Sequence, residues 1–261
     1  MTAETPVIVE HGPITTITIN RPRVKNALNG EAWRLLGEAL NAAADDTEVR
    51  VVVLTGAGGD FCAGADLADR SGRPAHPLPN MHRVNKVAQA IHDLPKPTVA
   101  KVDGVAVGAG MNLAIGCDLV VATPRARFSE IFARRGLSLD LGGSWLLPKL
   151  VGLRQAQRLA LLADFVQGEE ARELGLVTWV VEPEKIDAFV DDLTGKLLAG
   201  PPVALAQNKQ LVNAAVDMTL AQALQAEARA QTVNQGGEDP GAAREAFVNK
   251  TEPVFTGRWR A

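Results

Sequence analysis

The chain has 261 residues, of which 46% are hydrophobic and 22% charged, and its formal net charge at pH 7 is −3. This length predicts one large domain or a core with a smaller appendage. The acidic balance excludes a general basic surface for nucleic acid, and no uncharged apolar run has membrane-spanning length. The N-terminal stretch MTAETPV lacks a basic region before an apolar one, and two cysteines among glycines fit a reducing compartment. We therefore expect a cytoplasmic protein with no nucleic-acid or membrane partner.

The first part of the chain predicts a strand followed by an amphipathic helix. Residues 14–20 alternate apolar and polar side chains, as in a half-buried strand. The next helix is expected to begin at Asn29 or Gly30, because a one-sided apolar stripe follows, formed by Trp33, Leu36 and Leu40.

Three apolar runs predict buried strands. Residues 49–56 form a continuous branched run, and similar runs cover residues 98–110 and 117–123. A helix that ends near Leu94 separates the first two. Buried strands that alternate with helices are typical of an α/β core with a largely parallel sheet.

The second part of the chain is mostly helical. We expect a short helix over 168–176, a strand over 177–181 and helices over 184–200, 201–215 and 219–235. The chain accordingly divides into a core, residues 1–195, and a helical C-terminal region, residues 196–261. One irregular segment, Ala68–Asn80, is rich in Pro and Gly and fits a surface loop as well as an active-site lid.

Several common site motifs fail. The third glycine of a dinucleotide fingerprint would fall on Phe61 in one glycine-rich stretch and on Leu113 in the other. The histidines are not paired in sequence and the cysteines are far apart, so no metal site is predicted. No nucleophile motif of the serine or cysteine hydrolases is present.

Two glycine-rich stretches remain, LTGAGGDFCAGADL and VDGVAVGAGMNLAIGCD, each predicted to be a buried strand that ends in small residues before a helix. Small residues let a ligand approach backbone amides, and two amides that converge on one oxygen form an oxyanion hole. Tight packing of strand against helix explains the same residues, so this pattern leaves both interpretations open.

The stretches NRPRVKNALN, FCAGADL, VDGVAVGAGMNLAIGCDLVVAT and AFVNKTEPVFTGR occur in an order that resembles the enoyl-CoA hydratase/isomerase family, the crotonases. The resemblance implies a core of repeated ββα units and a helical C-terminal region that mediates trimerisation, often in a dimer of trimers. It also implies an acyl-CoA thioester substrate that becomes an enolate, with no metal and no cofactor beyond the CoA moiety.

Carried over by motif position, the resemblance assigns the oxyanion hole to the amides of Ala65 and Ala109. It assigns CoA binding to Arg23, Val24, Ala63, Asp66, Leu67, Lys250 and Phe255. Arg21, Arg23 and Lys25 form a local cationic patch for the CoA phosphates, and a solvated loop is the alternative interpretation.

The sequence departs from the family's hydratases at both catalytic glutamates. Asn112 stands at the first position and Phe132 at the second, while Glu130 lies two positions from the second. General acid–base groups contribute about 10²–10⁴-fold each, so ordinary hydratase activity should be poor. Asp140, in GLSLDLGG, matches the branch that places an Asp before a glycine pair, which includes phenylacetate-pathway isomerases.

Asp140 has two interpretations. As a base, it would remove the α-proton and return it at the γ-carbon, and Leu137, Leu139 and Leu141 would raise its pKa by desolvation. As a structural residue, it would cap the helix expected near Gly143. A hydratase that uses Glu130 and a silent acyl-CoA-binding protein remain as alternatives. The acyl pocket is expected to be formed by Asn112, Phe132, Leu137 and Trp145.

Overall fold

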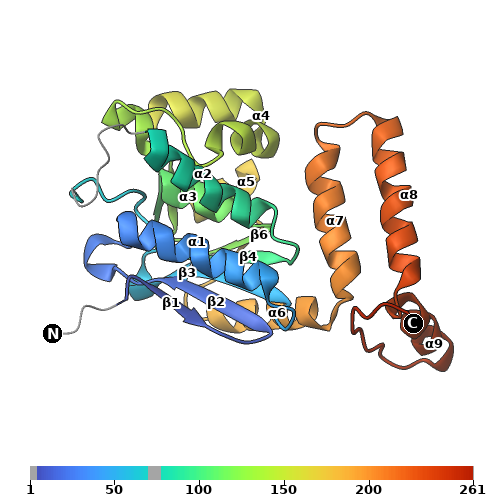
Figure 1. Cartoon of the computed structure of the whole chain (residues 1–261). Coiled ribbons are helices and arrows are strands. Elements are labelled where there is room, and N and C mark those ends of the chain that lie inside the picture. Colours follow the sequence, from blue (N-terminus) through green and yellow to red (C-terminus); the bar gives the residue numbers. More distant parts are fainter. Residues whose placement is uncertain (1–4, 70–77, 261) are drawn as a thin grey trace.

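The computed structural model describes residues 5–69 and 78–260. A core with a central sheet and flanking helices occupies one side of the molecule, and a helical arm projects from it (Figure 1).

The central sheet has six strands in the order β1-β2-β3-β4-β6-β9. The first pair, β1 (Val7–Glu10) and β2 (Ile14–Ile19), is antiparallel, and all the other neighbours are parallel. The parallel strands after β2 are β3 (Val51–Gly56), β4 (Thr98–Val102), β6 (Leu119–Ala122) and β9 (Trp179–Val180). The largely parallel sheet predicted from the buried apolar runs is confirmed.

A smaller sheet contains β5 (Val105–Val107), β7 (Arg127–Ser129) and β8 (Val166–Gln167). The prediction of one strand over 98–110 is therefore wrong. The chain turns at Asp103 and Gly104, and Val105 N donates to Asp60 Oδ1 at 2.8 Å. That turn moves the chain from the large sheet to the small one, which periodicity alone does not reveal.

Helices cover both faces of the large sheet. One face carries α1 (Gly30–Asp45), α2 (Leu78–His92) and α3 (Ala109–Ile115), and the other carries α6 (Ile186–Ala199). Alternation in β3 produces this arrangement: Val52 and Leu54 pack with the first set, whereas Val51 and Val53 pack against α6.

The predicted start of α1 is confirmed. Asn29 is the N-cap, and its side chain accepts a hydrogen bond from Ala32 N at 2.9 Å. The apolar stripe on this helix, Trp33, Leu36 and Leu40, is buried.

The irregular segment expected over Ala68–Asn80 ends earlier than predicted, because α2 already begins at Leu78. Residues 70–77 of that segment lie outside the described residues. The elements of the core not yet named are the 3₁₀ turns η1 (Pro22–Val24), η2 (Ala57–Gly59) and η3 (Ile131–Arg135) and the helices α4 (Gly143–Leu162) and α5 (Gly168–Leu174).

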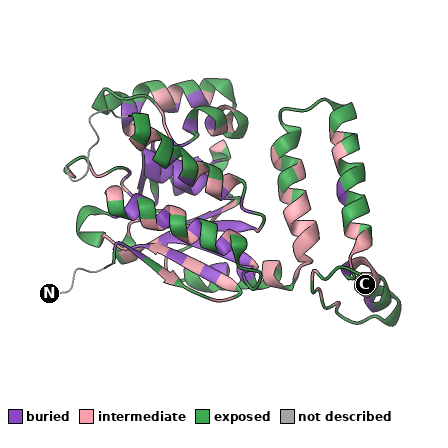
Figure 2. Cartoon of the chain, in the orientation of Figure 1, coloured by how far each residue is buried: buried purple, intermediate pink, exposed green. Residues whose placement is uncertain are grey.

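The C-terminal arm consists of α7 (Pro202–Ala215), α8 (Leu220–Gly236) and α9 (Asp239–Asn249). Figure 2 shows α7 and α8 mostly exposed or half-buried, in contrast to the buried interior of the core. The predicted division after residue 195 falls inside α6, whose Leu197 still packs against the sheet. None of the helices within residues 5–69 and 78–260 is both long and apolar enough to cross a membrane.

The burial of α1 leads to a stability prediction. Leu36→Ala should lower the free energy of unfolding by about 2–5 kcal/mol, because the side chain is fully buried in the core. Leu161→Ala on α4 is the matched control, since Leu161 is 73% exposed, and it should change that free energy by less than about 0.5 kcal/mol. Urea unfolding followed by circular dichroism measures both, and equal effects would contradict the assigned packing.

Candidate active site

A cavity of about 340 Å³ lies between the small sheet, α3 and the segment before α4. Its lining residues come from distant parts of the chain: Lys25, Ala63, Gly64, Ala65, Leu67, Val105, Val107, Gly108, Ala109, Arg127, Ile131, Phe132, Arg135, Leu137, Asp140 and Phe165. The two glycine-rich stretches thus meet at one place, together with the predicted carboxylate.

A short backbone ladder brings the two stretches together. Cys62 N donates to Val105 O at 2.8 Å, and Val107 N donates to Cys62 O at 2.9 Å. Two residues later Gly64 has a φ of +87°, and a Cβ there would lie 2.8 Å from Val107 O and 3.4 Å from Ala109 N. Only glycine permits this approach without strain, so Gly64 determines how close Ala65 comes to Ala109.

Among the described loop and turn contacts, neither the Ala65 amide nor the Ala109 amide donates a hydrogen bond. Leu28 bonds to the residues on either side of Ala65, receiving from Asp66 N at 2.9 Å and donating to Gly64 O at 2.7 Å, so the Ala65 amide points away from Leu28. Ala109 is the first residue of α3, and amides at a helix start lack a partner in their own helix. Two such donors beside one cavity can bind an oxyanion. No α-helix directly follows the first stretch, which differs from the sequence prediction.

Asp140 is half-buried at this cavity, and its Oδ1 is buried without a hydrogen-bond partner among the residues that the structure describes. Burial raises the pKa of this carboxyl to about 6, the direction expected from its leucine neighbours. The capping interpretation is wrong. The N-cap of α4 is Gly142, no side chain caps that helix, and Gly143 N donates to the backbone oxygen of Asp140 at 2.9 Å. The carboxylate of Asp140 is therefore not used to cap α4.

Asn112 links Asp140 to a second carboxyl group. Its Nδ2 donates to the backbone oxygen of Asp140 at 3.0 Å and lies 3.4 Å from Oε2 of Glu130. Glu130 is fully buried, and burial raises its pKa to about 8, with the charge of Asp140 adding to the rise and the bond from Asn112 opposing it. The start of α4 can lie against Asn112 because residue 143 is a glycine, since a Cβ there would lie 2.5 Å from Asn112 Nδ2.

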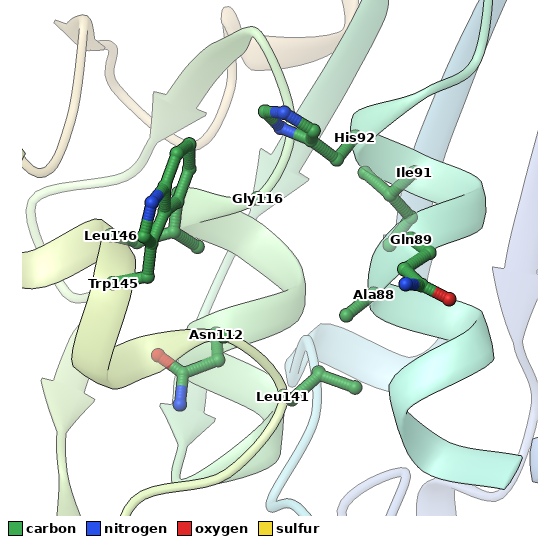
Figure 3. Close-up of a pocket in the computed structure, with 10 residues that line it drawn as sticks. Ala88, Gln89, Ile91, His92, Asn112, Gly116, Leu141, Trp145 and Leu146 are labelled. Carbon is green, nitrogen blue, oxygen red and sulfur yellow. The ribbon is translucent and has the colours of Figure 1, made fainter. Parts of the chain in front are cut away.

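Asn112 also lines a second cavity of about 380 Å³, which is mostly apolar and lies between α2, α3 and α4. Figure 3 shows Trp145 and Leu146 on one wall and Ala88, Ile91 and His92 on the facing helix α2. The His92 and Trp145 rings meet edge to face, with centroids 5.2 Å apart.

The residues predicted for one acyl pocket are divided between the two cavities. Phe132 and Leu137 line the cavity of Asp140, whereas Asn112 and Trp145 line the second one. Leu141 and Gly142 border the second cavity directly after Asp140 in the chain, so this segment separates the two spaces.

The family model for enoyl-CoA hydratase/isomerase matches residues 10–258 of this chain. The chain belongs to the enoyl-CoA hydratase/isomerase family. The predicted crotonase fold is likewise confirmed, since an enoyl-CoA hydratase from Bacillus anthracis superposes with a TM-score of 0.92 at 27% identity, covering 97% of this chain and 100% of that one.

Curated relatives of this family member carry both types of name. A 1,2-epoxyphenylacetyl-CoA isomerase from Escherichia coli is 38% identical over 255 residues, covering 96% of this chain and 97% of the relative. A probable enoyl-CoA hydratase from Rhodobacter capsulatus is 37% identical over 247 residues, covering 94% and 95%. These names establish an acyl-CoA enzyme family but do not separate isomerase from hydratase.

The residues predicted to bind CoA lie in three places. Ala63 and Leu67 line the cavity of Asp140, as does Lys25 of the cationic patch. Arg23 and Val24 are exposed on η1, next to this region in the chain. Asp66 pairs with Arg21 at 2.9 Å, which removes Arg21 from the free charges of the patch. Lys250 and Phe255 belong to the C-terminal arm and do not line this cavity; their role in CoA binding stays a prediction.

Sequence reasoning missed the cationic side of the cavity. Arg127 and Arg135 line it, and the Arg127 guanidinium lies 4.6 Å from the ring centre of Phe165. Phe165 lies far from both arginines in the sequence, so only the fold reveals that it lines the same cavity. Within the described ranges, no group of three or more His, Cys, Asp or Glu side chains is placed to hold a metal ion.

The close approach at Gly64 can be tested. Gly64→Ala should reduce α-proton exchange of butyryl-CoA in D₂O by roughly 10²-fold, the typical effect of losing one oxyanion donor, because the added Cβ pushes Ala65 away from Ala109. Gly195→Ala on α6 is the control, since a Cβ there meets nothing within 4 Å. Exchange by NMR that is equal in both variants would refute the role of this approach.

Proposed function

We propose that the chain is an acyl-CoA double-bond isomerase that uses Asp140 as its single acid–base group. One observation carries the proposal. Asp140 is the only carboxylate among the described lining residues of the cavity that also holds the Ala65 and Ala109 amides, and its Oδ1 has no competing partner. The raised pKa of this carboxyl makes it a stronger base than an exposed aspartate.

The reaction follows from this placement. With the thioester oxygen at the two amides, ionised Asp140 removes a proton from the α-carbon of a 3-enoyl-CoA. The electron pair of the broken C–H bond moves into a dienolate, whose negative charge the amides stabilise. Asp140 then returns the proton to the γ-carbon, which yields the 2-enoyl-CoA without any cofactor other than the CoA moiety.

The two cavities suggest places for the ends of the substrate. We infer that the exposed Arg23 and Lys25 hold the CoA phosphates and that Ala63 and Leu67 contact the CoA moiety. The distal part of the acyl group then enters the apolar cavity of Asn112 and Trp145. The Escherichia coli relative's name makes 1,2-epoxyphenylacetyl-CoA a substrate to include in any panel.

The assembly of the family is also proposed for this chain. Large apolar side chains are exposed on α7 and α8, including Val212 at 70%, Leu220 at 75% and Leu224 at 53%. Exposed apolar side chains on these helices favour association, so we propose a homotrimer or a dimer of trimers.

A hydratase is the second candidate, because the Rhodobacter capsulatus relative is named a probable enoyl-CoA hydratase. Water addition with two carboxylates would require Glu130 to reach the substrate, yet Glu130 is fully buried and does not line the cavity. A silent acyl-CoA-binding protein is the third candidate and would bind acyl-CoA without exchanging α-protons.

Replacement of the base is the direct test. Asp140→Asn should reduce conversion of a 3-enoyl-CoA by roughly 10²–10⁴-fold, because the amide cannot accept the proton. Asp191→Asn on the exposed side of α6 is the matched control and should leave turnover unchanged. Turnover by a folded Asp140→Asn protein at the control rate would exclude Asp140 as the base. Crotonyl-CoA hydration that survives Asp140→Asn and fails in Glu130→Gln would support the hydratase instead.

The pKa of Asp140 predicts the acidic side of the pH profile. Because the base must be ionised, kcat/KM should fall as the pH drops through about 6, the value to which burial raises this carboxyl. An exposed aspartate would give a midpoint near 4. Initial rates between pH 4.5 and 7.5 measure this limb, and a midpoint near 4 would show that the base is not this buried group.

A further inference from the structure

The cluster around Asn112 has too many acceptors. Three of the four buried oxygen atoms without a hydrogen-bond partner in the described structure belong to this cluster: Asn112 Oδ1, Glu130 Oε1 and Asp140 Oδ1. Buried polar atoms are nearly always satisfied, and a buried acceptor without a donor is costly. The isomerase reaction accounts for Asp140 Oδ1, which takes the substrate proton, but leaves the other two unexplained.

A proton on Glu130 would supply the missing donor. A protonated carboxyl has one O–H donor in addition to its acceptor oxygen. Asn112 Nδ2 already lies 3.4 Å from Oε2, which leaves Oε1 as the oxygen able to carry the proton. A hydroxyl at Oε1 would give the cluster a second donor beside Asn112 Nδ2, which already serves the Asp140 carbonyl and Oε2.

The electrostatics of the cluster also favour the protonated form of Glu130. Glu130 and Asp140 influence one another electrostatically, and neither of the two salt-bridges a cation in the described part of the chain. Two like charges in a buried site cannot both be ionised without cost. The other titratable groups near the cluster line the two cavities: Lys25, Arg127, Arg135 and His92. An additional negative charge beside the enolate would oppose the charge that the oxyanion hole stabilises.

We propose that Glu130 is a positioning residue that works in its protonated form. It donates the hydrogen bond that the buried cluster needs, Asn112 connects it to the backbone of Asp140, and Asp140 remains the only anion beside the substrate. Glu130 does not line the cavity, so it does not touch the reacting atoms. This inference rests on the proposed role of Asp140.

The alkaline side of the pH profile tests the inference. Exchange of the α-protons of butyryl-CoA by the wild-type protein should decline as the pH rises through about 8, where Glu130 loses its proton. Glu130→Gln keeps a neutral donor of the same shape, so it should retain exchange near pH 7 and lose this decline. Glu130→Leu removes the donor and should reduce exchange by roughly 10–100-fold, the effect of one missing buried hydrogen bond. Glu38→Gln, exposed on α1, is the matched control and should keep the wild-type profile.

Stability provides a readout that does not depend on activity. The pKa of Glu130 is raised to about 8 in the folded chain, compared with about 4.3 for an unfolded glutamate. The stability that protonated Glu130 contributes is therefore complete below pH 4.3 and is lost as the pH rises towards 8. The urea midpoint of the wild type should fall relative to that of Glu130→Gln over this range.

Two results would overturn the inference. One is a Glu130→Gln profile with an unchanged alkaline decline, and the other is a urea midpoint difference that does not vary with pH. The proposed function is tested by a different variant, because only Asp140→Asn reports whether Asp140 is the base.

Discussion

The site depends on the backbone contact between residues 62–65 and the strand β5 with the start of α3. Two ladder hydrogen bonds join Cys62 to Val105 and Val107, and Gly64 removes the side chain that would otherwise separate Ala65 from Ala109. Because the first segment follows β3 of the large sheet and the second begins the small sheet, this contact also ties the two sheets together. The placement of the Ala65 and Ala109 amides beside one cavity is thus a direct consequence of how the sheets join.

The carboxyl side of the site depends on a second close contact. Gly143 lets the start of α4 lie against Asn112, and Asn112 holds the backbone of Asp140 at 3.0 Å. The family's hydratases resemble one another in carrying glutamates at the positions of Asn112 and Phe132. In this chain an amide and an aromatic ring stand there, and the carboxyl groups come from Glu130 and Asp140 instead. In the proposed mechanism the acid–base group therefore comes from another position in the chain, whereas the two amides stay at the positions of the family motifs.

Sequence reasoning worked where one local pattern determines the result. The apolar stripe and Asn29 cap defined α1, and motif order gave the family and the meeting of Ala65 with Ala109. Sequence reasoning failed for features that depend on tertiary contacts. Residues 98–110 are apolar throughout, so their hydrophobicity could not reveal that the chain changes sheets at Asp103 and Gly104. Nor could the sequence show that Glu130 is buried or that Trp145 and Phe132 face different cavities, because these depend on how η3 and α4 pack.

The segment from Asp140 to Gly142 is a wall shared by both cavities, and this has a consequence for selectivity. A substrate whose acyl group fills the apolar cavity would contact Leu141 and Gly142, next to the proposed base Asp140. The same contact also bears on Asn112, which fixes the backbone of that residue. If the proposed function holds, acyl groups of different size should differ in turnover as well as in affinity, since the acyl group would contact the same piece of backbone that carries the proposed base.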